Sequence, residues 1–109
     1  MQNTYKASTQ KYIEVLDGIE RKTLVFGEHT LFVEFKLAAG KTVPLHSHPE
    51  EQAGYLVSGH ILLFFGGKQY DIKQGDAWAI PGGTSHSSKM LEDSVAVEVF
   101  SPVRKEYLP

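Results

Sequence analysis

Residues 40–59 read GKTVPLHSHPEEQAGYLVSG, and a second stretch at residues 75–90 reads GDAWAIPGGTSHSSKM. In both stretches turn-forming glycine and proline bracket the histidines, which are His46 and His48 in the first and His86 in the second. Residues two apart on a strand project from one face with Cα atoms roughly 6.6 Å apart. His46 and His48 can therefore reach one ion together, and His86 is the candidate third ligand from another strand. This layout predicts a metal site on an all-β scaffold.

Apolar and polar residues alternate with a period of two through most of the chain, which predicts strands. The pattern is clearest at residues 30–37, where every second residue from Leu31 to Leu37 is apolar. Gly66-Gly67 is typical of a two-residue hairpin turn. Many short strands without a convincing amphipathic helix favour a β-barrel or jelly roll. The other predicted strands are 21–26, 52–58, 61–65, 69–72, 77–80, 86–90 and 95–100.

The length of 109 residues fits one domain, which we assign to residues 1–109. Apolar residues make up 41% of the sequence, enough for a compact β-structure. Because burial in so small a body is limited and oligomerisation extends it, we expect a homodimer. Residues 1–20 are more polar and less periodic, and we interpret them as an N-terminal arm with at most one edge strand. Its exchange with a partner subunit is left open.

Charge and cysteine content exclude several classes of partner and site. Eleven Lys and Arg against thirteen Asp and Glu give a formal net charge of −2, without a basic stripe, which argues against nucleic acid. The sequence has no cysteine, so a metal must take nitrogen and oxygen ligands. The first residues contain no apolar signal region, and no stretch approaches the roughly 20 apolar residues of a membrane span. We therefore expect a cytoplasmic protein without a membrane partner.

The predicted metal site contains three imidazoles and one side-chain amide. Two further histidines, His29 and His60, lie beside turn-forming residues, and we do not assign them to the site. Imidazole and amide ligands suit Mn, Fe, Co, Ni, Cu and Zn alike, so the pattern indicates one divalent transition metal without its identity. The predicted ligands are His46, His48, Gln52 and His86.

The two stretches resemble the two motifs of the cupin superfamily. The resemblance implies a single-domain double-stranded β-helix, the cupin jelly-roll β-barrel, with motif one at 40–59 and motif two at 75–90. It leaves the reaction open, because the superfamily includes isomerases, dioxygenases, decarboxylases, sugar sensors and storage proteins. The matching positions are Gly40, His46, His48 and Gly59 in the first motif, and Gly75, Pro81, Gly83 and His86 in the second.

One position departs from the common first motif, which carries glutamate where this chain has Gln52. Glu51 has the wrong strand parity to replace it unless a bulge intervenes. Three neutral imidazoles and a neutral amide leave the ion its full double charge. We therefore expect a site that holds metal less tightly and favours an anionic ligand.

The phrase His-Ser-His-Pro-Glu-Glu-Gln and the ending Val-Glu-Val-Phe-Ser-Pro-Val-Arg are similar to the pectin-degradation cupins of the KdgF type. In that family a small cupin converts cyclic 4,5-unsaturated monouronates to linear keto forms. The resemblance implies that His46, His48, Gln52 and His86 hold the metal. It also places the family's acidic, aromatic and arginine positions, in that order, at Glu98, Phe100 and Arg104.

The chemistry of these residue types suits such a reaction independently. Opening an enol ether in a sugar ring requires protonation at one carbon, and Glu98 is the predicted proton-transfer group. Arg104 offers a planar fork for the carboxylate of an anionic sugar acid. Two alternatives stay open: a dioxygenase with Fe or Mn, and a non-catalytic sugar- or metal-binding cupin. The aromatic residues predicted to line the pocket are Tyr55, Trp78, Phe100 and Phe64.

Overall fold

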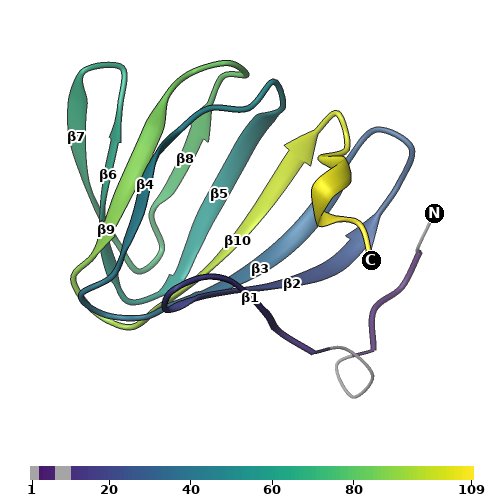
Figure 1. Ribbon diagram of the computed structural model, residues 1–109, viewed down its shortest axis with the longest axis horizontal. Helices are drawn as coiled ribbons and strands as arrows, with labels where there is room; N and C mark the ends of the chain where they lie inside the picture. The colour runs from purple at the N-terminus through teal and green to yellow at the C-terminus, as the bar shows by residue number, and fades with distance from the viewer. Residues whose placement is uncertain (1–2, 7–10) are drawn as a thin grey trace.

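The computed structural model describes residues 3–6 and 11–109, which form two antiparallel sheets (Figure 1). The order of the six-stranded sheet is β1-β2-β3-β10-β5-β8, and that of the four-stranded sheet is β4-β9-β6-β7. The strands are β1 (Ile13–Leu16), β2 (Ile19–Phe26), β3 (Leu31–Leu37), β4 (Thr42–His46), β5 (Glu51–Ser58), β6 (His60–Phe65), β7 (Lys68–Lys73), β8 (Ala77–Ile80), β9 (His86–Met90) and β10 (Ser94–Ser101). This architecture confirms the predicted all-β cupin fold.

The alternating residues of β3 show why the sequence folds this way. Leu31, Val33, Phe35 and Leu37 are all buried, while the residues between them face outward. Burial of one face fixes the register of each strand, since a slip by one residue would expose the whole apolar set. The two sheets enclose a core that also includes Leu56, Ile61, Leu63 and Met90.

The hairpin between β6 and β7 forms as predicted. Phe65 pairs with Lys68, and Gly66 and Gly67 between them have φ of 61° and 72°. Glycine adopts this left-handed region without the steric cost that a Cβ imposes. The turn therefore sets the register of the β6–β7 pair.

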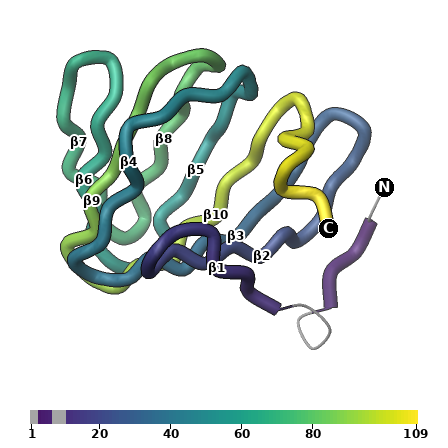
Figure 2. The backbone as a smooth tube through the Cα atoms, in the orientation of Figure 1, coloured from purple at the N-terminus to yellow at the C-terminus, as the bar shows by residue number. Residues whose placement is uncertain are grey.

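Two expectations about the first half of the chain need comment. β4 ends at His46, so His48 lies in the loop before β5, and the assumption that both histidines share one strand is wrong. β1 is the edge strand expected within the N-terminal arm, and it pairs with β2. The arm's residues 1–2 and 7–10 lie outside the described part of the chain, which Figure 2 traces as a tube.

The end of the chain turns back toward β2, β3 and β10 (Figures 1 and 2). A short 3-10 helix (Lys105–Tyr107) carries Tyr107 to this position. Arg21 Nη1 donates a hydrogen bond to the carbonyl oxygen of Tyr107 at 3.1 Å, and the Thr23 hydroxyl donates to the same oxygen. The C-terminal segment thus forms part of the wall around the space between the sheets.

Within the residues that the structure describes, no helix is long and apolar enough to cross a lipid bilayer.

Candidate metal centre

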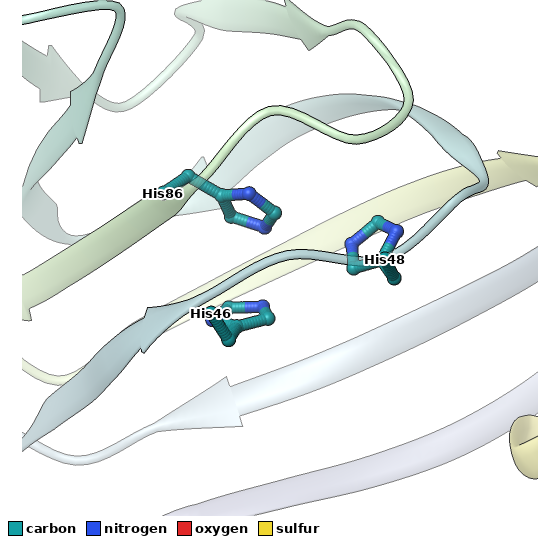
Figure 3. Close-up of side chains that lie close together, drawn as sticks. All are labelled: His46, His48 and His86. Atoms are coloured by element: carbon teal, nitrogen blue, oxygen red, sulfur yellow. The ribbon is translucent and has the colours of Figure 1, made fainter.

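Three histidines from separate segments meet inside the barrel (Figure 3). His46 ends β4 and pairs with His86, which begins β9, while His48 reaches them from the β4–β5 loop. One ring nitrogen from each residue lies within 4.8 Å of the other two. The ring centres of His46 and His86 are 4.2 Å apart, and those of His48 and His86 are 5.1 Å apart. The spacing suits one shared cation.

The orientation of each imidazole is set by a backbone carbonyl two residues away. Each Nδ1 lies 2.8 or 2.9 Å from that oxygen, and because a carbonyl only accepts, Nδ1 carries the proton. Each Nε2 then keeps its lone pair, as in metal sites where a hydrogen bond to the other nitrogen fixes the ligand. For His46, His48 and His86 in turn, the carbonyls belong to Pro44, Glu50 and Thr84.

Burial also favours the neutral imidazoles that metal binding requires. Desolvation lowers the pKa of His48, and the nearby Arg104 charge lowers it further. Desolvation likewise lowers the pKa of His86. Both rings are therefore neutral near pH 7, the form that coordinates a metal.

Gln52 supplies the fourth predicted ligand. It is buried on β5, whereas the neighbouring Glu51 is exposed, which agrees with the parity expected for both. Gln52 Oε1 lies 2.7 Å from His48 Nε2, and Gln52 Nε2 donates to Glu98 Oε1 at 3.1 Å. Because the His48 proton is on Nδ1, His48 Nε2 has a lone pair and no hydrogen. Two lone pairs, one on His48 Nε2 and one on Gln52 Oε1, therefore face each other and repel. A shared cation would stabilise this arrangement, so the donor set fits a divalent metal.

A second carboxyl lies behind His48, on the side away from Gln52. Glu50 Oε1 is 3.5 Å from His48 Nδ1, its side chain is 12% exposed, and Oε1 has no hydrogen-bond partner. The turn formed by Pro81, Gly82 and Gly83 holds the β4–β5 loop in place, because the Gly83 N–H donates to the His48 carbonyl at 2.8 Å. A Cβ at Gly82 would collide with the Pro49 carbonyl, so only glycine permits this close approach.

Glu98 occupies the inner face of β10. Its side chain lines the same pocket as His46, Gln52 and His86. Burial raises the pKa of Glu98 to about 7, although hydrogen bonds and the Arg104 charge oppose the rise. A carboxyl with such a pKa exchanges a proton near neutrality.

Trp78 reaches Glu98 from two strands away. In the sheet, Glu98 on β10 pairs with Gly54 on β5, and Gly54 pairs with Trp78 on β8. A Cβ at Gly54 would collide with the indole, so the glycine lets the ring lie across β5. Trp78 Nε1 then donates to Glu98 Oε1 at 3.3 Å. Trp78 therefore lines the pocket as predicted, and it fixes the carboxyl that holds Gln52.

Arg104 and Tyr107 line the same pocket beside Glu98. The Arg104 side chain is 13% exposed, and its Nε donates to Glu106 Oε1 at 2.9 Å. Its guanidinium carbon lies 4.2 Å from the centre of the Tyr107 ring and 5.3 Å from that of Phe100. The pocket thus combines an imidazole cluster, a carboxyl and a guanidinium.

Three of the four aromatic residues predicted to line the pocket do not line it: Phe100, Tyr55 and Phe64. Phe100 is 1% exposed and packs against His48 and Tyr107, with ring centres 5.7 and 5.5 Å away, so it supports the site from behind. Tyr55 is 47% exposed and does not line this pocket. The reason is parity: Gln52 and Leu56 on β5 point inward, and Tyr55 between them points outward. Phe64 follows the buried Ile61 and Leu63 on β6 with the opposite parity, so it points to the other face of that strand.

Arg21 and Tyr107 belong to the site's surroundings although no motif marks them. Strand periodicity could have indicated that Arg21 points inward, because it shares strand parity with the buried Ile19 and Thr23. Tyr107 has no comparable signal, since it lies in a short segment without strand periodicity. Only the fold brings the two residues together.

Comparison with known proteins agrees with this geometry. Residues 33–102 match the family model described as a cupin domain. The pectin degradation protein KdgF of Dickeya dadantii is 30% identical over 97 residues, which cover 87% of this chain and 88% of that protein. The structure of KdgF from Halomonas sp. has a TM-score of 0.91 at 29% identity, covering 97% of this chain and all of that one.

A second structure shows how far the fold extends beyond sequence similarity. An RmlC-like cupin from Shewanella frigidimarina superposes with a TM-score of 0.93 at 19% identity, covering 99% of this chain and 97% of that one. At that identity the likeness concerns the fold alone. Together with the paired histidine segments between two sheets, the family match shows that this chain belongs to the cupin family, in the group that includes KdgF.

Proposed function

We propose that the chain is a metal-dependent isomerase that converts cyclic 4,5-unsaturated monouronates, released by pectin or alginate breakdown, to linear keto-uronates. The supporting observation is that one pocket joins the imidazole cluster to the Glu98 carboxyl and the Arg104 guanidinium. The similarity to proteins named KdgF favours pectin degradation among the activities of cupins. The proposed metal ligands are His46, His48, Gln52 and His86.

The reaction moves one proton within the substrate. The hydroxyl at C1 loses its proton and becomes a carbonyl, the bond from C1 to the ring oxygen breaks, and that oxygen becomes the ketone at C5. The carbon at C4 gains the proton, so atoms and charge balance without an oxidant. A divalent ion supplies positive charge for the negative charge that develops on the substrate oxygen.

The protein's own residues have distinct roles in this proposal. Glu98 carries the proton, because it is the carboxyl of the pocket and is held in place by Gln52 and Trp78. Arg104 binds the uronate carboxylate with its terminal nitrogens, since Nε already donates to Glu106. Exclusion of bulk water by the two sheets strengthens both interactions.

The test follows the ultraviolet absorbance of the conjugated enol in freshly prepared lyase products. We expect the protein to accelerate its decay, and Glu98→Gln to lower kcat by about 100-fold or more, which is the usual contribution of a positioned acid or base. Glu92→Gln, on the exposed turn before β10, is the control with the same change of charge. Decay at the protein-free rate would contradict the proposal.

Two further measurements separate the alternatives. An oxygen electrode detects a dioxygenase, because linearisation consumes no oxygen. NMR of the sugar after incubation detects a non-catalytic binding protein, which would leave the ligand chemically unchanged.

A further inference from the structure

Arg21 is a cation on the inner face of β2, and among the described residues it has no carboxylate partner. Its Nη1 donates to two neutral oxygens, Thr23 Oγ1 at 3.2 Å and the Tyr107 carbonyl at 3.1 Å. Its Nε is buried without a hydrogen-bond partner. In the described part of the chain, no acidic side chain lies within ion-pair distance of Arg21. A partly buried charge of this kind favours an anion nearby.

The Tyr107 ring contacts two guanidiniums. The guanidinium carbon of Arg21 lies 4.6 Å from the ring centre, and that of Arg104 lies 4.2 Å from it. Two like charges against one ring repel each other, and the electron-rich faces of the ring only partly offset this repulsion. Glu106 neutralises part of the Arg104 charge but is itself 58% exposed, where water screens it.

The packing of Tyr107 determines where Arg104 lies. The ring has edge contacts with Phe35 and Phe100, at 6.0 and 5.5 Å between centres. Its carbonyl accepts hydrogen bonds from Arg21 and Thr23, which anchor the C-terminal segment to β2. Arg104 stacks on the ring that this anchor holds. Removal of the anchor would therefore release the guanidinium that faces the pocket.

We propose that Arg21 is a positioning residue for the substrate carboxylate: it anchors Tyr107, the Tyr107 ring holds Arg104 at the pocket, and the unpaired Arg21 charge favours an anionic ligand there. The choice of a uronate as that ligand rests on the proposed function. The charge and the packing that carry the inference do not depend on the metal, since Arg21 contacts none of the proposed ligands.

The experiment measures binding of D-galacturonate and of neutral D-galactose to the purified, metal-loaded protein by calorimetry. We expect tighter binding of galacturonate than of galactose, and about tenfold weaker galacturonate binding in Arg21→Met, the effect of one charge-assisted interaction. Arg21→Lys should recover part of the loss. Lys105→Met removes an exposed cation from the same C-terminal segment and should change neither ligand's affinity.

A second pair of variants separates the ring from the hydroxyl of Tyr107. Tyr107→Phe keeps the stacking surface and should retain more galacturonate affinity than Tyr107→Leu, which should weaken binding about as much as Arg21→Met. In turnover of unsaturated uronate, Arg21→Met should raise KM while kcat stays within about threefold of the wild-type value. Thermal unfolding and metal content verify that each variant is folded and loaded.

Three outcomes would overturn the inference: equal galacturonate affinity in folded Arg21→Met, an equal loss in Lys105→Met, or no preference of the wild type for galacturonate over galactose. The series also separates this inference from the proposed function. A wild-type protein that binds galacturonate selectively through Arg21, yet leaves the decay of unsaturated uronate unchanged, would contradict the reaction and retain the anion site.

Discussion

The two ends of the pocket are built in different ways. The histidine end is held by short-range geometry, because every ring is fixed by a carbonyl two residues away. The arginine end is held by long-range contacts, since the hydrogen bond from Arg21 to Tyr107 joins residues 86 positions apart. The histidine end consists of His46, His48, Gln52 and His86. The arginine end consists of Arg104 and Tyr107, which line the pocket, and of Arg21, which anchors Tyr107 from β2.

This difference teaches which functions a short motif can encode. Metal coordination needs a few donor atoms at fixed separations, and a loop with fixed turns supplies them locally. Anion recognition needs a guanidinium aimed across the pocket, and its direction depends on the packing of other segments. Glu98 connects the two ends, because it accepts a hydrogen bond from Gln52 and the nearby Arg104 charge lowers its pKa.

The largest expected effect concerns the histidine end. His48→Ala removes one of three converging nitrogens, and we expect metal content to fall below about a tenth of one ion per chain after dialysis. His29→Ala is the control, since His29 is exposed on the turn between β2 and β3. Elemental analysis makes the measurement. An unchanged ratio of metal to protein in His48→Ala would contradict the assignment of the metal site.

The second effect tests the link between the two ends. The pKa of Glu98 is about 7 in the folded protein against 4.5 for an ordinary glutamate, so the folded state retains a proton that the unfolded chain releases. Stability from this group is therefore lost as pH rises from about 4.5 to 7. In EDTA-treated protein, Glu98→Gln should raise the free energy of unfolding by roughly 3 kcal/mol at pH 8 and less than about 1 kcal/mol at pH 5.

Urea titration at both pH values measures this difference. Glu92→Gln, in which an exposed carboxylate is lost, serves as the control. An equal gain at pH 5 and pH 8 would show that the proton on Glu98 is not the cause.

The third effect sharpens the account of the histidine end. Glu50 places a carboxylate oxygen behind His48 Nδ1, where negative charge makes the imidazole a better donor to a cation. We expect Glu50→Gln to weaken metal affinity by about tenfold, as outer carboxylates do in other metal sites. Glu51→Gln makes the same change at the adjacent exposed residue and should have no effect. Competition with a chelator gives the metal dissociation constants of the Glu50→Gln and Glu51→Gln variants. Equal constants would exclude a role of Glu50 in metal binding.

The smallest effect lies outside both ends. Tyr55 points away from the pocket, so Tyr55→Ala should change KM for unsaturated uronate by less than about twofold, the usual range for surface substitutions. Steady-state kinetics make the comparison with Trp78→Phe, which loses the hydrogen bond to Glu98. A large rise of KM in Tyr55→Ala would place substrate on the outer face of β5.

Strand periodicity predicted most of the fold because burial of one face dictates alternation. The predicted strands 77–80 and 86–90 coincide with β8 and β9, and the other predicted strands differ from the observed ones by one or two residues at one or both ends. Periodicity did not identify β4 as a separate strand, and it did not show that this strand ends at His46, since His48 continues the alternation inside a loop. The prediction that Tyr55 lines the pocket was wrong although the sequence held the signal, because Tyr55 has the opposite strand parity to the predicted ligand Gln52.

By itself the sequence determined the all-β fold and the three histidines that converge, because turn residues and alternation act over short distances. Tertiary structure alone decided that Glu98 faces inward, that Trp78 crosses Gly54 to reach it, and that Arg21 anchors Tyr107. These contacts join strands far apart in the chain. Their geometry follows from the packing of two sheets and a returning C-terminal segment, and no local pattern of residues encodes it.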